Sequence, residues 1–315
     1  MLTKQTLTIA SANLFNFIEP PNAFYDFENI YERDAWQDKC RWTTEQIQAL
    51  AADVIGLQEV FSIEATQALF AQMGYPFFAT VETPKVADEY IYSHPVVAIA
   101  SRYPLKHIQA VTTPNDLISE GYGVEAPPFS RSPVYCIVDV PHIGELGFYV
   151  CHLKSQRAAE SLIPDKAQPL IGRWLSSQQR GWEALMLRLF SEQQYAQHPM
   201  PTVLVGDMNQ ALSSDISGLL TQPANNEPHK LQFKDSWQLL LDTPQDRPAT
   251  HYHFSRGHVL DYILLSQEFQ PDSVYSLADV TQFTTLDDHL INPSYEQDKN
   301  ASDHAFIAVT LRFVL

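Results

Sequence analysis

The sequence predicts an α+β protein in which two mixed β-sheets pack face to face between outer helices, a four-layer αββα sandwich. Many short strand-like runs recur along the chain with turn residues between them. Few helical segments intervene, and strands and helices do not alternate regularly, as a doubly wound parallel sheet would require. Because no repeat, low-complexity run or change of composition marks a boundary, we expect residues 1–315 to form one domain.

Three segments carry the apolar spacing of a helix. The first has Ile47 and Leu50 on one face, with Thr43 or Thr44 as its cap. The second ends before Gly74, a residue that commonly terminates helices. The predicted helices are residues 42–51, 65–73 and 178–190. The predicted strands are residues 8–14, 53–59, 96–100, 134–140, 147–152, 202–206, 259–265 and 305–313.

The composition is that of a folded protein, with 45% hydrophobic and 11% aromatic residues, and it excludes the disordered class. The first ten residues alternate too much for a signal peptide, and no stretch reaches the roughly 20 apolar residues of a membrane span. Cys136 and Cys151 lie in apolar runs, where we expect buried free thiols. With Cys40 they form a sparse, odd set, which favours a cytoplasmic location and leaves export open.

The formal net charge of −17 disfavours broad electrostatic capture of nucleic acid. It does not exclude a nucleic-acid substrate, because bound cations reverse the local charge where the chemistry happens.

Ionisable and amide side chains follow the predicted strands in order. They are Asn13, Glu59, His152, Asp207, Asn209, Asp261, Asp303 and His304. Catalytic groups are often placed on loops at the ends of a rigid strand scaffold. Hydrolysis of a phosphate ester needs a base for water, a cation holder and donors for the developing charge, and these side chains could supply all three.

Each of these residues has a simpler explanation when it is considered alone. Asp207 and Asn209 could form an ordinary turn that satisfies its own backbone. Glu59 could be a solvated strand end, and Asp303 could cap the strand or helix that follows. Their joint occurrence in this order favours the catalytic interpretation.

Seven motifs follow one another along nearly the whole chain in the order of a known family. They are Ser11-Ala-Asn13, Asp53-Val-Ile-Gly-Leu-Gln-Glu59, Ser101-Arg-Tyr-Pro-Leu105, His152-Leu-Lys-Ser155, Val205-Gly-Asp-Met-Asn209, Leu260-Asp-Tyr-Ile-Leu264 and Ser302-Asp-His304. The chain thereby resembles the endonuclease/exonuclease/phosphatase superfamily of deoxyribonuclease-like, metal-dependent phosphoesterases, in its bacterial His-Leu-Lys-Ser form.

The resemblance implies a Mg²⁺ cofactor, with Mn²⁺ as a substitute. Glu59 matches the principal metal ligand, Asn13 supports the same ion, and Asp303 binds or orients a metal. Oxygen ligands of this kind suit Mg²⁺, which keeps several waters and shares the substrate phosphate.

The same resemblance implies the catalytic roles. Asp207 matches the carboxylate that orients or deprotonates the attacking water, and Asn209 matches the amide that donates to the phosphate. His304, held by Asp261, would stabilise the charge of the phosphorane-like transition state or transfer a proton. His152 resembles the second histidine, placed across the scissile phosphate.

Two cations are candidates for substrate binding. Lys154 could contact a substrate phosphate as a point charge, or could be a surface lysine. Arg131 matches a position where related nucleases place an arginine near the substrate backbone, with a structural salt bridge as the alternative.

Other groups are expected to be structural. His251 and His253 alternate on a strand and are expected on its exposed face, although they could chelate a metal. Residues 287–289 (Asp-Asp-His) match no family motif and are expected at the surface. The aromatic-rich segment 16–41 could form a substrate wall that stacks on bases, or a minor core beneath the loop.

The predicted function is Mg²⁺-dependent hydrolysis of phosphodiesters in nucleic acid, which would make the chain a nuclease. A phosphatase or phosphodiesterase acting on a lipid head group or a small phosphorylated molecule is the alternative. The acidic charge favours this alternative, whereas the His-Leu-Lys-Ser form favours the nuclease. A catalytically silent binding protein would be expected to lack some of these residues, and none is missing. The expected partner is a phosphate-ester substrate, and no protein partner can be inferred.

Overall fold

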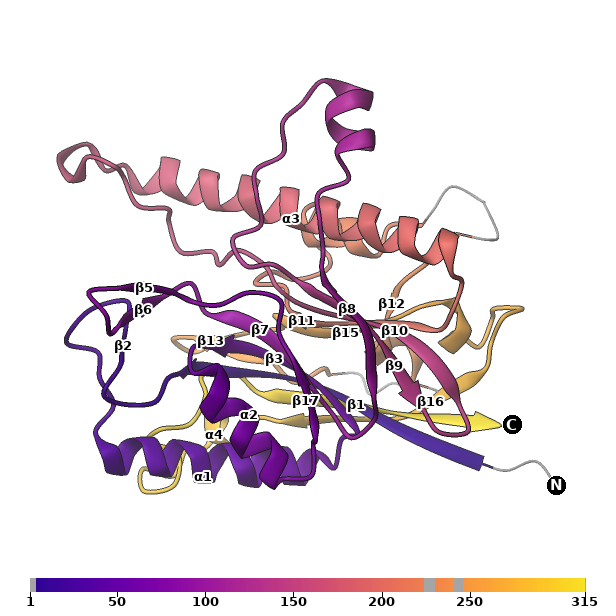
Figure 1. Ribbon diagram of the computed structural model, residues 1–315, viewed down its shortest axis with the longest axis horizontal. Coiled ribbons are helices and arrows are strands. Elements are labelled where there is room, and N and C mark those ends of the chain that lie inside the picture. The colour runs from indigo at the N-terminus through magenta and orange to yellow at the C-terminus, as the bar shows by residue number, and fades with distance from the viewer. Residues whose placement is uncertain (1–3, 224–229, 241–245, 315) are drawn as a thin grey trace.

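The computed structural model describes residues 4–223, 230–240 and 246–314, and two large β-sheets dominate it (Figure 1). The first sheet runs in the order β16 (Ala278–Leu286), β17 (Phe306–Val314), β1 (Lys4–Phe17), β3 (Val54–Val60), β7 (Val96–Ser101) and β4 (Phe77–Ala79). The second runs in the order β12 (Lys234–Asp235), β15 (Asp261–Leu265), β11 (Thr202–Asp207), β10 (Gly144–His152), β9 (Val134–Val140) and β8 (Leu105–Ala110).

Each sheet contains one parallel pair among antiparallel neighbours. β1 pairs parallel with β3, and β10 pairs parallel with β11. The carboxyl ends of these four central strands therefore bring their polar terminal residues toward one side of the molecule, where the candidate site lies.

The largest core lies between the sheets. Its side chains come from the inner faces of both and include Ile9, Val54, Val150, Val205 and Ile263, all essentially inaccessible to water. Each fully buried aliphatic side chain of this kind contributes roughly 1.5–3 kcal/mol relative to leaving it exposed. Because the helices cover the outer faces, the central strands are apolar on both sides, which explains their nearly continuous apolar runs.

Helices cover the outer faces of both sheets. α1 (Arg33–Leu50) and α2 (Ile63–Gln72) pack on the first sheet, and α3 (Pro169–Gln197) packs on the second. A short helix, α4 (Asp288–Ile291), precedes β17. The four layers follow in the order helix, sheet, sheet and helix (Figure 1), so the predicted αββα sandwich of two mixed sheets is confirmed.

Two helices are much longer than predicted. α1 begins at Arg33 instead of residue 42, because polar Lys39 and Thr43 occupy buried positions on its inner face and conceal the apolar spacing. α3 extends over residues 169–197 instead of 178–190, and its start was missed because its first turns expose apolar side chains such as Leu170 and Trp174.

Smaller elements surround the strand ends. β2 (Ala23–Phe24), β6 (Ile91–Ser93) and β5 (Lys85–Ala87) form a three-stranded sheet, and β13 (His251–His253) pairs with β14 (Arg256–His258). A π-helical turn covers Asp116–Glu120, and 3₁₀ turns cover Pro164–Lys166, Ser217–Leu220, Ser236–Leu239 and Gln267–Phe269.

Segment 16–41 contains both buried and exposed aromatic side chains. Phe17 and Trp36 pack against each other in the interior, with ring centroids 4.6 Å apart, whereas Tyr25 and Phe27 are exposed. The segment therefore contains a minor core and also presents aromatic side chains to solvent.

Two further expectations can be compared with the structure. Cys136 and Cys151 are buried free thiols, as predicted. None of the helices in the described part of the chain is long and apolar enough to cross a membrane.

The packing of the two sheets should depend on the small size of Gly56 in β3. A Cβ atom at this position would lie 2.2 Å from Cγ2 of Val205 in the opposite sheet. We expect Gly56→Ala to lower the free energy of unfolding by about 1–3 kcal/mol, the usual effect of overpacking, in urea denaturation.

Gly181 in α3 provides the matched control for this prediction. A Cβ atom there would meet only Cγ2 of Ile216, at 3.8 Å. Gly181→Ala should raise stability by about 0.5–1 kcal/mol, because alanine favours the helix. Equal effects of the two substitutions would contradict the proposed steric constraint.

Candidate active site

The polar side chains at the strand ends meet around one carboxylate, that of Asp207 at the end of β11. The side chain is buried, and its Oδ2 atom faces nitrogen atoms from both sheets. Nδ2 of Asn13, at the end of β1, donates to it at 3.2 Å, and Nδ2 of Asn209 donates at 3.3 Å. Nε2 of His152 lies 3.4 Å away. A buried carboxylate requires such partners, since an unpaired charge in the interior is strongly unfavourable.

The backbone around Asp207 explains this placement. Gly206 has a φ of +151°, and a Cβ atom there would lie 2.0 Å from the carbonyl oxygen of Cys151. Only glycine permits this approach, which sets Asp207 directly beside His152 in the β10–β11 register. Asn209 adopts a left-handed φ of +53°, and its N–H donates to Oδ1 of Asp207 at 2.7 Å.

Both amide hydrogens of Asn209 are directed at protein acceptors. Nδ2 donates to the carbonyl of Leu153 at 2.9 Å as well as to Asp207 at 3.3 Å. The resemblance implies that this amide donates to a phosphate. To do so, it would have to give up its longer hydrogen bond, the one to Asp207.

The strands β1 and β3 are irregular at their carboxyl ends, where Asn13 and Glu59 lie. The β1–β3 register shifts between Asn13 and Phe17, and the β3–β7 register shifts between Leu57 and Val60. Glu59 has a φ of +61°, a conformation that costs of order 1–3 kcal/mol in a residue other than glycine and that clusters at functional sites. Its Oε2 accepts the N–H of Asn16 at 2.8 Å.

His304 and Asp261 form a buried pair beside Asp207. Nδ1 of His304 lies 2.8 Å from Oδ2 of Asp261, and its Nε2 lies 3.8 Å from Oδ2 of Asp207. Burial by itself lowers the pKa of His304, but the carboxylates of Asp261 and Asp207 outweigh burial and raise that pKa well above its usual value. This shift favours the charged imidazolium, whose Nδ1 is hydrogen-bonded to Asp261 and whose Nε2 faces the carboxylate of Asp207.

Two other groups have pKa values shifted by the same enclosure. Burial raises the pKa of Asp207, while the charge of His304 acts in the opposite direction. Burial, reinforced by the positive charge of Arg131, lowers the pKa of His152 well below its usual value. The centre thus combines a charged histidine, a neutral histidine and a carboxylate with an increased affinity for a proton.

Ser302 connects the Ser-Asp-His motif to β1. Its Oγ donates to the carbonyl oxygen of Asn13 at 2.6 Å and accepts the N–H of His304 at 3.0 Å. These two hydrogen bonds place His304, at the start of the last strand, next to the end of the first.

Several groups could hold a metal ion. Asp207, Asp261 and His304 place ligand atoms within 4.8 Å of one another, and so do His251, Asp303 and His304. Oδ1 of Asp303 is buried without a hydrogen-bond partner in the described part of the chain, so it is available as a ligand. Glu59 belongs to neither compact group.

His251 was expected on an exposed strand face, and this expectation is wrong. It is half-buried, its ring centroid lies 4.9 Å from that of His304, and its Nε2 lies 3.9 Å from Oδ2 of Asp303. The reason is tertiary, because the N–H of Ala305 donates to the carbonyl of Thr250 and joins β13 to the Ser-Asp-His segment.

His289 was expected at the surface, and it too is half-buried. Its ring packs edge-on against Trp42, and its Nε2 lies 3.1 Å from the carbonyl oxygen of His304. His253 is exposed, as predicted.

Lys39 is a buried cation that the sequence analysis missed. Its side chain is 1% exposed, and Nζ donates to the carbonyl of Asn300 at 3.4 Å and lies over the rings of Phe15 and Tyr31. Burial lowers the pKa of Lys39 to about 8, against the carboxylates of Glu59 and Asp303, which raise it. The only signal in the sequence for a buried cation was a lysine at a position on the inward-facing side of the helix.

The two predicted substrate cations lie near each other. Burial lowers the pKa of Lys154, and the charge of Arg131 lowers it further. Within the described residues, Nε and Nη1 of Arg131 are buried without partners, and no ion pair is found for this side chain. The structural salt bridge considered for Arg131 is thus not found there, and two of its donors remain available.

Two buried charges of α3, Arg180 and Glu183, hold the loops beneath these cations and were also missed. Glu183 accepts the backbone N–H of Ser130 at 2.8 Å and that of Lys154 at 2.6 Å. Arg180 donates to the carbonyl of Lys154 at 2.9 Å and to Oε1 of Gln210 at 2.8 Å. A helix residue that acts on backbone groups in distant loops leaves no local pattern in the sequence.

The two-sheet sandwich thus encloses a buried histidine–carboxylate centre at its strand ends. The model of the endonuclease/exonuclease/phosphatase family matches residues 40–304. The chain therefore belongs to that family and is a phosphoesterase. Comparison with the curated proteins found no match.

Solved structures share the fold at low sequence identity. Human Nocturnin (catalytic domain with bound sulfate) is 16% identical, with a TM-score of 0.62, and the match covers 99% of this chain and 98% of that one. D. rerio TDP2, humanised by 14 mutations, is 17% identical over 97% and 98% of the two chains, with a TM-score of 0.60. D. rerio TDP2 complexed with a single-strand DNA product matches with the same identity and coverage and a TM-score of 0.57.

We expect the pKa of His304 to depend on Asp261. Asp261→Asn removes the charge that lies 2.8 Å from Nδ1, so the pKa of His304 should fall by at least one unit, which corresponds to about 1.4 kcal/mol less stabilisation of the charged ring. Histidine ring resonances followed by NMR against pH, assigned with His304→Gln, would measure it. An unchanged pKa would mean that Asp261 does not stabilise the imidazolium.

Proposed function

We propose that the chain is a Mg²⁺-dependent phosphodiesterase that cleaves nucleic acid by attack of water on phosphorus. The observation that carries this proposal is the buried Asp207 carboxylate, flanked by neutral His152 on one side and by charged His304 on the other. A base, a cationic donor and amide donors within a few ångströms of one point are what a phosphoryl-transfer site requires.

In the proposed reaction, Asp207 takes a proton from the attacking water. Its raised pKa makes it a stronger base than an exposed carboxylate and keeps proton transfer favourable near neutral pH. The new P–O bond forms as the bond to the leaving oxygen breaks, and negative charge grows on the phosphate oxygens. The Nε2–H of His304 would donate to those oxygens, and the amide of Asn209 would do so after giving up its longer hydrogen bond, to Asp207.

Asn13, Glu59 and Asp303 would hold the metal ion. Their amide and carboxylate oxygens suit a hard cation, and Oδ1 of Asp303 is a buried atom without a hydrogen bond in the described part of the chain. When bound, Mg²⁺ would neutralise charge on the phosphate. Mn²⁺ should substitute, because it accepts the same oxygen ligands.

Nucleic acid is the proposed substrate because cations gather beside the centre despite the net charge of −17. Arg131 has free donors, and both Arg131 and Lys154 influence the pKa of His152. The D. rerio TDP2 structure with a single-strand DNA product supports the same substrate class for a protein of this fold.

A phosphodiesterase or phosphatase that acts on a lipid head group is the second candidate. It is favoured by a cluster of exposed apolar side chains around the start of α3, among which Leu162 is fully exposed. Nucleic-acid cleavage does not require such a cluster.

A panel of substrates distinguishes these functions. Plasmid DNA, single-stranded DNA, RNA, bis-p-nitrophenyl phosphate and phospholipid vesicles would be incubated with Mg²⁺ or EDTA, with Asp207→Asn as the inactive control. Mg²⁺-dependent cleavage of a nucleic acid supports the proposal, and cleavage of phospholipid alone selects the second candidate. No hydrolysis of any substrate with Mg²⁺ or Mn²⁺ would contradict both.

The proposed metal site gives a prediction for Glu59. Glu59→Gln removes one negative charge from an ion with few protein ligands, so the Mg²⁺ concentration for half-maximal activity should rise at least tenfold. Activity titrated with Mg²⁺ and Mg²⁺ binding measured by calorimetry would test this. Glu64→Gln on α2 is the control, and an unchanged Mg²⁺ requirement in Glu59→Gln would remove Glu59 from this role.

The proposed phosphate contacts give a prediction for Arg131 and Lys154. Replacing both with Gln should weaken nucleic-acid cleavage mainly through KM and should flatten its dependence on salt, because fewer counterions are released. Bis-p-nitrophenyl phosphate lacks flanking phosphates and should be hydrolysed at nearly the normal rate. Normal DNA cleavage by the double variant at every ionic strength would show that these cations do not bind the substrate.

A further inference from the structure

The segment that leads into α3 exposes an unusual number of large apolar side chains. Every residue from 160 to 171 is exposed, and Trp174 and Leu175 follow on the first turns of the helix. We call this cluster the apolar tip, and it consists of Leu162, Ile163, Leu170, Ile171, Trp174 and Leu175. Contiguous apolar surface of this kind marks an interaction site in a folded protein.

The apolar tip is held in place by a hydrogen-bonded scaffold. The N–H of Ala159 donates to the carbonyl of Gly172 at 3.0 Å, and Oγ of Ser176 donates to the carbonyl of Arg157 at 2.7 Å. A Cβ atom on Gly172 would lie 2.5 Å from the carbonyl oxygen of Ala159, so the loop packs closely against the helix. The apolar side chains therefore stay exposed although the base of the loop is hydrogen-bonded to the helix.

The apolar tip projects from the body of the protein on the side of the candidate active site. In Figure 1, β1 runs leftward from the N-terminus toward the site, and the loop before α3 extends beyond the sheets on that same left side.

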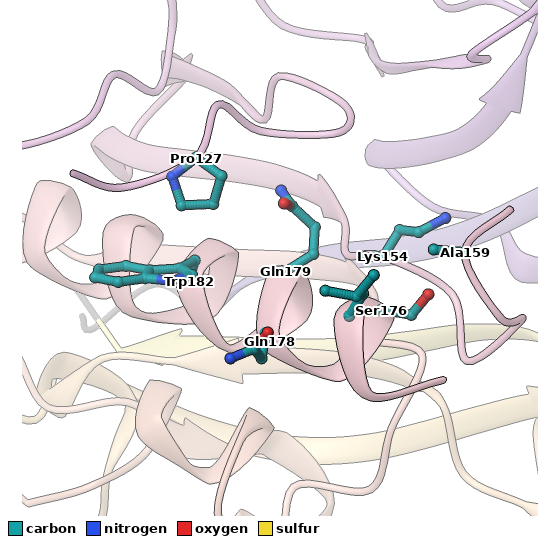
Figure 2. Close-up of a pocket in the computed structure, with 8 residues that line it drawn as sticks. Pro127, Lys154, Ala159, Ser176, Gln178, Gln179 and Trp182 are labelled. Atoms are coloured by element: carbon teal, nitrogen blue, oxygen red, sulfur yellow. The ribbon is translucent and has the colours of Figure 1, made fainter. Parts of the chain in front are cut away.

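Two adjoining cavities connect the tip with the site. One, of about 360 Å³, is lined by Lys154 together with Ala159, Leu175 and Trp182 (Figure 2). The other, of about 730 Å³, is lined by the loop itself, including Leu162 and Ile163, and shares Ala159 and Leu175 with the first. The surface from the proposed phosphate-binding lysine to the apolar tip is thus continuous.

Charge along the segment from Lys154 to the apolar tip is opposite in sign to the charge of the whole chain. Between residues 154 and 175 the cations are Lys154, Arg157, Lys166 and Arg173, and the carboxylates are Glu160 and Asp165. This local excess of positive charge contrasts with the net −17. Apolar side chains with an exposed tryptophan, flanked by Lys and Arg, are typical of surfaces that bind phospholipid head groups and insert into the interface.

We propose that the apolar tip binds the surface of a phospholipid bilayer, with Leu162, Ile163 and Trp174 in the interfacial layer. Lys166 and Arg173 then contact lipid phosphates, and the candidate active site faces the membrane. A second copy of the chain is the competing occupant. It is disfavoured because two chains of net charge −17 repel each other, whereas the cations beside the tip attract lipid phosphates.

Vesicle flotation in EDTA tests the proposal without catalysis, so its outcome is independent of the proposed function. The vesicles would contain phosphatidylcholine alone or with one quarter phosphatidylglycerol, at physiological ionic strength. The wild-type chain should float with both and more strongly with the anionic vesicles. Leu162→Ser combined with Trp174→Ser should lower the partition coefficient about tenfold or more, because the apolar contact is lost.

Matched variants distinguish binding through the apolar tip from nonspecific hydrophobic adsorption to vesicles. Val274→Ser combined with Leu277→Ser alters two exposed apolar residues elsewhere and should leave binding unchanged. Lys166→Gln combined with Arg173→Gln should remove the preference for anionic vesicles while retaining binding to phosphatidylcholine. The tip variants should hydrolyse a soluble diester as the wild-type chain does.

Trp174 supplies a direct readout, since it is the exposed one of five tryptophans, all of which the structure describes. Vesicles should shift its fluorescence to shorter wavelength, and Trp174→Phe should abolish the shift. Failure of the wild-type chain to float, or flotation unchanged in the Leu162/Trp174 variant, overturns the proposal. A dimer in analytical ultracentrifugation that the same variant dissociates would also overturn it and would assign the tip to a second copy.

Discussion

The arrangement of the whole protein depends on a carboxylate buried where its two sheets meet. Asp207 belongs to the second sheet, yet Asn13 at the end of the first sheet donates to it from 194 positions away along the chain. An unpaired carboxylate would be strongly unfavourable in this interior, so the sheets can pack at this end only if their strand ends supply donors. The polar centre and the apolar core between the sheets therefore require the same alignment.

That alignment is maintained by groups that do not themselves face the centre. Ser302 joins the last strand to the first, and Thr250 accepts the N–H groups of Leu260 and Asp261 where β15 begins. On the outer side of the second sheet, Glu183 of α3 binds the backbone of two loops that carry Arg131 and Lys154. Reactive side chains are positioned within fractions of an ångström only when such surrounding hydrogen bonds fix their backbone.

The polar strand ends and the apolar tip differ in their exposure to solvent. Charged and polar groups are enclosed at the strand ends, while the apolar tip is exposed on the same side of the molecule. Enclosure strengthens each electrostatic interaction: burial raises the pKa of Asp207, and the neighbouring carboxylates of Asp261 and Asp207 raise that of His304. Exposure of the tip is unfavourable in water, because burying its apolar surface in another apolar phase lowers the free energy.

The sequence alone determined the two mixed sheets, the family and the order of the polar strand ends, because strand periodicity and short motifs are local properties. Only the tertiary structure decided what those ends contact. Lys39 occupies a buried position that helical spacing assigns to an apolar residue, and His251 lies beside His304 because a bridge joins two distant segments. The start of α3 escaped prediction because its apolar residues face solvent. Burial and long-range contact are properties of the packed chain, and no window of neighbouring residues encodes them.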